Sequence, residues 1–158
     1  MPAVNVFPPR QNTTQQTNFV RRQVSFADLA ASLAAPIQFG SLPVGSVITR
    51  VALSVDTAFN GGTTNTVQVG TSYANANELA IPADFAVGAA GYAEATRGRG
   101  NGLTQTPTGA IPVPGGPLGG VDTSEGGVGL FYKYNSTGTP PTAGHAILTV
   151  EFIPPSGD

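Results

Sequence analysis

Apolar and polar residues alternate along several segments of the chain, which is the period of a β-strand with one buried face. The longest such segment is 46–56, where Val, Thr, Val, Leu and Val occupy the odd positions from 47 to 55 and are expected to face the core. Similar alternation begins at Phe19 and resumes at 66–70. We expect strands at these positions, with the glycine-containing turn at 58–62 joining 46–56 to 66–70 as a hairpin.

Two further strands are expected near the end of the chain. In 128–134, Tyr132 and Tyr134 share a face with two aliphatic residues, and in 146–152 the even positions are Ala, Leu, Val and Phe. We therefore expect both tyrosines in the core. The prolines at 154–155 should end the last strand, because neither ring carries an N–H.

One helix signal is clear. Ser25 followed by Asp28 is typical of a helix start, where a hydroxyl accepts from a backbone N–H and a carboxylate lies in the positive first turn. The Ala-rich run 29–35 then predicts one or two turns of helix, which Pro36 ends. Shorter helix-permissive stretches lie within 75–87.

Two segments have no period and are rich in proline, glycine or neutral polar residues. Residues 1–18 are interpreted as an extended N-terminal arm, with a frayed terminus as the alternative. Residues 88–120 contain ten glycines and four prolines, too many for a packed helix, so we expect a loop region at about 88–127 with one strand near 108–113. The remaining chain, 19–158, is expected to form a single domain.

The pattern as a whole predicts an all-β protein. We expect a two-sheet β-sandwich, a jelly roll with Greek-key connections, of about eight strands with one or two short helices and the N-terminal arm. A barrel is the alternative. The sequence shows no internal repeat, which argues against propellers and solenoids.

Charged residues are scarce. They make up only 10% of the 158 residues, where about 25% is ordinary, so neutral polar groups must cover the surface. Such a surface costs little to desolvate and suits a protein that is covered by partners. A net charge of −2 offers no attraction to phosphate backbones or anionic lipid, so we expect no nucleic acid and no membrane as partner.

The residues that usually carry chemistry are few. The absence of cysteine and the single histidine, His145, exclude thiol chemistry and most metal sites. His145 begins the last strand on the face opposite the core, so we expect a structural role for it. Any serine triad would need the same histidine, and no phosphate-binding glycine loop is present. We expect no enzymatic activity, no cofactor, no metal and no small-molecule substrate.

Paired carboxylates could catalyse glycoside hydrolysis. Only Glu151 is placed securely on a predicted strand, and it has no acidic neighbour there, so we expect exposed, solubilising carboxylates. Residues 122–125 lack the ligand alternation of a calcium loop. The carboxylates considered are Asp56, Asp84, Glu94, Asp122, Glu125 and Glu151.

Several segments resemble a known family. The runs 24–29 (VSFADL), 42–60 (LPVGSVITRVALSVDTAFN) and 67–71 (VQVGT) resemble tailed-bacteriophage head decoration, or cement, proteins of jelly-roll type. The run 145–153 (HAILTVEFI) fits their last strand. The resemblance covers about a third of the chain, rests on strands and turns, and leaves out the glycine-rich insert at 88–127.

The resemblance implies a non-enzymatic virion protein, made in the host cytoplasm, on the outer surface of a phage capsid. There it would bridge neighbouring major capsid proteins and help the shell resist internal DNA pressure. The partners it implies are the major capsid protein and copies of the chain itself, as a dimer or trimer. We expect the arm and the loop region to make these contacts by strand addition and by loop contacts. The candidate partner-binding residues are Phe7, Pro8, Pro9, Arg10, Arg97 and Arg99.

Two alternatives remain open. A carbohydrate-binding jelly roll would need exposed aromatic rings, for which Tyr73 and Tyr92 are the candidates, because Tyr132 and Tyr134 are expected in the core. The other alternative, a tail or fibre component of the same virion, differs from the decoration role only in location.

Overall fold

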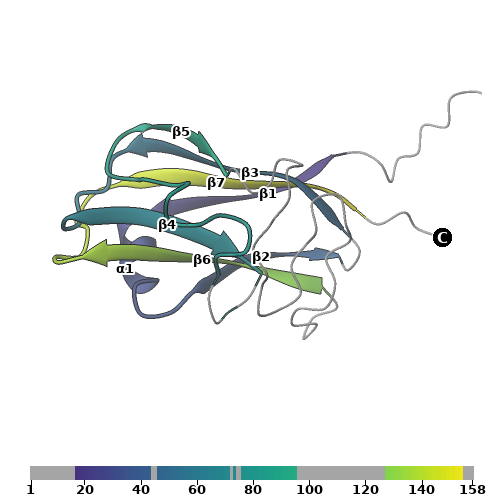
Figure 1. The fold of residues 1–158 in the computed structure, drawn as a ribbon, viewed down its shortest axis with the longest axis horizontal. Helices are drawn as coiled ribbons and strands as arrows, with labels where there is room; N and C mark the ends of the chain where they lie inside the picture. The colour runs from purple at the N-terminus through teal and green to yellow at the C-terminus, as the bar shows by residue number, and fades with distance from the viewer. Residues whose placement is uncertain (1–16, 44–45, 72, 74–75, 96–126, 155–158) are drawn as a thin grey trace, which may run out of the picture.

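The computed structural model describes residues 17–43, 46–71, 73, 76–95 and 127–154, whose strands form two antiparallel sheets stacked face to face (Figure 1). One sheet has four strands in the order β1-β7-β3-β5, and the other has three in the order β2-β6-β4. The elements are β1 (Asn18–Ser25), α1 (Phe26–Ala31), β2 (Ile37–Pro43), β3 (Val47–Thr57), β4 (Thr64–Gly70), β5 (Gly91–Glu94), β6 (Gly127–Thr137) and β7 (His145–Ile153). The all-β sandwich predicted from the sequence is confirmed.

The chain moves from one sheet to the other between every two successive strands, β1 to β7, and the first and last strands lie side by side. Residues 79–87 run alongside β4 and are paired to it by two isolated antiparallel bridges, Thr66–Ala86 and Val69–Ala80. They occupy the position of an eighth strand. This strand order is that of a jelly roll.

The predicted hairpin between 46–56 and 66–70 is wrong, because β3 pairs with β5 and β7 whereas β4 pairs with β6. The connection crosses between the sheets. Phe59 is buried in the core, and the Thr63 N–H donates to the Thr137 carbonyl at 2.9 Å, which starts the pairing with β6.

The core lies between the sheets and is built from the alternating positions of the long strands. Tyr132 and Tyr134 are 1% and 0% exposed, as expected from the sequence. The apolar core residues of the four longest buried strand faces are Val51, Leu53 and Val55 of β3, Val67 and Val69 of β4, Leu130, Tyr132 and Tyr134 of β6, and Ala146, Leu148, Val150 and Phe152 of β7.

A β-bulge changes the prediction for β3. Ile48 pairs with Phe152 and Arg50 with Glu151, so Thr49 is an extra residue with no counterpart on β7. The bulge turns Ile48 into the core, although strict alternation places it on the opposite face from Val51. Arg50 remains on the outer face of the sheet.

Helix α1 has the predicted capping box. The Asp28 N–H donates to Ser25 Oγ, and the Ser25 N–H donates to Asp28 Oδ2 at 2.9 Å. The helix ends at Ala31, before the predicted limit at Pro36. The described part of 75–87 contains turns and bridges and no helix, because its backbone groups bond to β4 instead. No helix in the described ranges is long and apolar enough to cross a membrane.

Candidate interaction surface

The outer face of the four-stranded sheet carries an open hollow of about 550 Å³, which we call the outer-sheet hollow. Its lining comes from all four strands, at positions that alternate with core residues. The lining residues are Phe19 and Arg21 of β1, Arg50, Ala52 and Ser54 of β3, Tyr92 of β5, and Ile147, Thr149 and Glu151 of β7.

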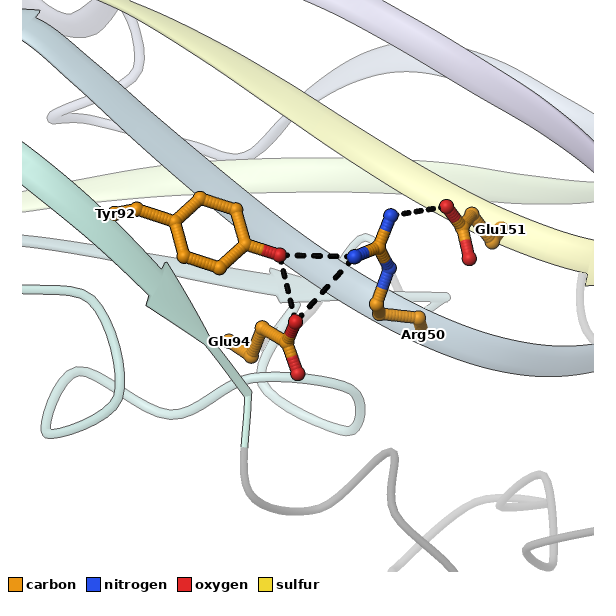
Figure 2. Close-up of polar contacts among 4 residues, drawn as sticks. All are labelled: Arg50, Tyr92, Glu94 and Glu151. Atoms are coloured by element: carbon orange, nitrogen blue, oxygen red, sulfur yellow. Dashed lines mark hydrogen bonds and ion pairs between the residues drawn. The ribbon is translucent and has the colours of Figure 1, made fainter.

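Arg50 is the centre of a polar network beside the hollow, and Figure 2 shows its guanidinium between the two glutamates. Its Nη1 donates to the Tyr92 hydroxyl at 3.0 Å and to Glu94 Oε1 at 3.3 Å, and its Nη2 pairs with Glu151. The Tyr92 hydroxyl in turn donates to Glu94 Oε1 at 2.7 Å. A single guanidinium therefore connects β3 to both β5 and β7.

The network keeps Arg50 and Tyr92 in their ordinary charge states. The hydrogen bond to Glu151 raises the pKa of Arg50, and the bond to Glu94 raises the pKa of the Tyr92 hydroxyl. Arg50 therefore stays cationic and Tyr92 stays a neutral donor at physiological pH. The hydrogen bonds hold the Tyr92 ring in place, and both Glu94 and Glu151 are paired with the Arg50 guanidinium.

The sequence-based expectation for the carboxylates needs correction. Glu151 does have a strand-borne acidic neighbour, Glu94, and both are ion-paired to Arg50. This grouping was missed because β5 lies inside the glycine-rich stretch that was expected to be loop. The only local signal was the short alternation Gly-Tyr-Ala-Glu of β5 itself.

Two exposed aromatic side chains lie in the outer-sheet hollow, on the two edge strands. Phe19 of β1 is 62% exposed, and Tyr92 of β5 is 58% exposed. The Arg21 guanidinium lies 5.5 Å from the centroid of the Phe19 ring, within the range of a cation–π contact. Both rings are therefore available for contact with a ligand or partner.

His145 is the first residue of β7 and lies on the same outer face. Its Nδ1 is 2.8 Å from both carboxylate oxygens of Asp56, and this bond is the main cause of the lowered pKa of Asp56. Ser25 pairs with His145 in the strand register, but its hydroxyl donates to Asp28 Oδ2 at 2.7 Å as part of the helix cap. The geometry therefore gives His145 a surface hydrogen bond to Asp56 and gives Ser25 a capping role.

Tyr73 and Asp84 are placed away from this hollow. Tyr73 is 60% exposed and packs edge-on against Phe131 of β6, with ring centroids 5.9 Å apart. Asp84 Oδ2 accepts from the Ile81 N–H at 2.9 Å within a turn. In the described ranges, no three His, Asp or Glu side chains are grouped so that they could hold a metal.

The other candidates cannot be placed, because they lie outside the described residues. They are Phe7, Pro8, Pro9, Arg10, Arg97, Arg99, Asp122, Glu125 and the strand predicted near 108–113.

Comparison with known proteins gives a structural neighbour. No protein-family model and no curated protein matches the sequence. The chain is similar to a chain of the solved structure "Cyanophage Pam1 capsid asymmetric unit", with 19% identity and a TM-score of 0.56. The likeness is one of fold. It covers 89% of this chain and 86% of the other, so it extends over nearly all of both chains.

Proposed function

We propose that the protein is a structural component of a phage particle, bound to the outer surface of the capsid, where it cements neighbouring major capsid proteins. The observation that carries the proposal is the likeness to a chain of a cyanophage capsid asymmetric unit over 86% of that chain. Jelly rolls also occur in lectins and cupins, so the fold alone does not indicate a virion role. Two further observations support that role: the sequence resemblance at 24–29, 42–60, 67–71 and 145–153, and the low content of charged residues.

The free strand edges support strand addition as the mode of attachment. Among the described residues, β1 pairs only with β7 and β2 only with β6, so each has one edge without a neighbouring strand. β2 contains no charged residue, whereas β1 carries Arg21 and Arg22. Charges on an edge oppose pairing with another strand, so β2 is the edge that accepts a strand from a capsid protein or a second copy.

In this proposal the arm, 1–18, and the region 88–127 add contacts through Phe7, Pro8, Pro9, Arg10, Arg97 and Arg99. Dimers or trimers repeated over a symmetric shell allow weak single contacts to add up by avidity.

The first experiment is mass spectrometry and cryo-electron microscopy of gradient-purified virions. We expect stoichiometric copies relative to the major capsid protein, located on the outside of the shell. A few copies per particle would assign the protein to the tail, and none would contradict a virion role.

A binding assay on capsids that lack the protein tests the attachment. We expect lower occupancy of the capsids after deletion of residues 2–17. We expect the same for Ser41→Lys, which places a charge at an exposed position of β2. The matched control is Ala83→Lys, in an exposed turn away from β2. If the deletion leaves capsid occupancy unchanged, the proposed contact of the arm is wrong. If Ser41→Lys leaves it unchanged, the proposed contact of β2 is wrong.

A further inference from the structure

The two exposed rings of the outer-sheet hollow are placed for an elongated ligand. Phe19 and Tyr92 lie on β1 and β5, the two edges of the four-stranded sheet. These strands are three strand spacings apart, or about 14 Å. A molecule that contacts both rings must therefore cross the whole sheet.

Tyr92 is held in place before any ligand binds. Its hydroxyl accepts from Arg50 and donates to Glu94, while the residue remains 58% exposed. A ring that is already fixed loses less side-chain freedom when a ligand packs on it. An exposed face on an ordered ring is what the C–H face of a sugar needs for stacking.

The floor of the hollow offers small and hydroxyl-bearing side chains between the rings. Ala52 leaves space, and Ser54 and Thr149 supply hydroxyls that can both donate and accept. Glu151 adds a carboxylate with more acceptor positions than its bond to Arg50 uses. Alternating donors and acceptors beside aromatic rings match the hydroxyl groups and C–H faces of a saccharide.

The charges around the hollow cancel. Two arginines, Arg21 and Arg50, are balanced by Glu94 and Glu151, and Arg50 is paired with both glutamates. There is therefore no net cationic site for a phosphate or sulfate group. We propose that the outer-sheet hollow binds a neutral saccharide of more than one sugar unit, through Phe19 and Tyr92. This inference is independent of the proposed function, since it concerns a different surface from the β2 edge.

The test uses the full-length protein on an array of immobilised neutral and acidic glycans, followed by calorimetric titration with the neutral oligosaccharide that binds best. We expect saturable binding to neutral glycans, and an affinity at least about tenfold lower for Tyr92→Ala and for Phe19→Ala. Tyr73→Ala is the matched control, because it removes an equally exposed tyrosine that lies in a turn after β4 and packs against the other sheet. It should bind as the unmodified protein does. Tyr92→Phe keeps the ring and should lose less affinity than Tyr92→Ala.

Four results would overturn the proposal. The first is the absence of saturable binding to any glycan, and the second is a preference for sulfated or phosphorylated glycans. The third is an equal loss in Tyr73→Ala and Tyr92→Ala. Lower capsid occupancy of Tyr92→Ala with unchanged glycan binding would also overturn it and would make the hollow a protein interface. Thermal unfolding checks that each variant folds. If Tyr92→Ala does not fold, the affinity of Phe19→Ala decides the test.

Discussion

Arg50 of β3 and Glu151 of β7 occupy paired positions in the sheet and form an ion pair on its outer face, although 101 residues separate them in the sequence. The same guanidinium reaches Tyr92 and Glu94 of β5. Because β5 is only four residues long and lies at the sheet edge, these side-chain bonds add to a short backbone pairing with β3.

Replacement of Arg50 by Gln should therefore loosen β5 selectively. We expect faster amide hydrogen exchange at 91–94 and only a small loss of global stability, because exposed ion pairs contribute little. Arg22→Gln is the control, since it removes a single exposed pair with Asp28, 3.5 Å apart, far from β5 in the sheet order. Equal exchange at 91–94 in Arg50→Gln and the unmodified protein would show that backbone pairing alone holds β5.

The Asp56–His145 pair should make the free energy of unfolding depend on pH under acidic conditions. The bond from His145 lowers the pKa of Asp56 below its ordinary value of 3.8. A carboxyl with a lowered folded-state pKa adds stability above its unfolded pKa, and that stability is lost as the pH falls through the folded-state pKa. We expect Asp56→Asn to be less stable than the unmodified protein at about pH 6 and to approach it at about pH 2.

Urea unfolding midpoints measured across this pH range check the prediction. In a His145→Gln background, the same Asp56→Asn substitution should have a smaller effect, because the bond is already gone. A constant difference between Asp56→Asn and the unmodified protein at every pH would contradict the assignment.

Sequence alternation identified which faces of the strands are buried, and therefore most of the core. Tyr132, Tyr134 and the even positions of 146–152 were assigned correctly because burial in a strand is a local, period-two property. The capping box of α1 was equally predictable, since Ser25 and Asp28 interact within one turn.

Strand partners were not predictable, because pairing is decided by contacts distant in the sequence. The expected hairpin failed where Phe59 leads the chain into the other sheet, and the bulge at Thr49 depends on the register with β7. The outer-sheet hollow needs β1, β3, β5 and β7 side by side. No single segment shows that Arg50 and Tyr92 will meet.

The helix cap provides a prediction about stability. Ser25→Ala removes the hydroxyl that accepts from the Asp28 N–H and donates to its carboxylate. Loss of such a cap costs about 0.5–2 kcal/mol of unfolding free energy. Ser25→Thr keeps a hydroxyl and should recover most of this loss, while Ser41→Ala, at an exposed position of β2, is the neutral control. A Ser25→Ala variant as stable as Ser41→Ala would mean that α1 is held by packing alone.

An added methyl group at Gly144 should be costly for two separate reasons. Its φ of +134° disfavours other residues, and a Cβ there would lie against the buried ring of Phe59. Gly138, with a φ of +99°, is the matched control, because the nearest heavy atom to its Cβ would be 3.5 Å away. Both alanine variants carry backbone strain, but only Gly144→Ala also overpacks the core.

We therefore expect Gly144→Ala to lose about 1–3 kcal/mol more unfolding free energy than Gly138→Ala, measured by urea titration. Phe59→Leu should remove part of that difference, because the smaller side chain makes room for the methyl group. Equal losses at the two glycines would show that the Phe59 ring can move aside, and that the crossing between the sheets is less tightly packed than its burial indicates.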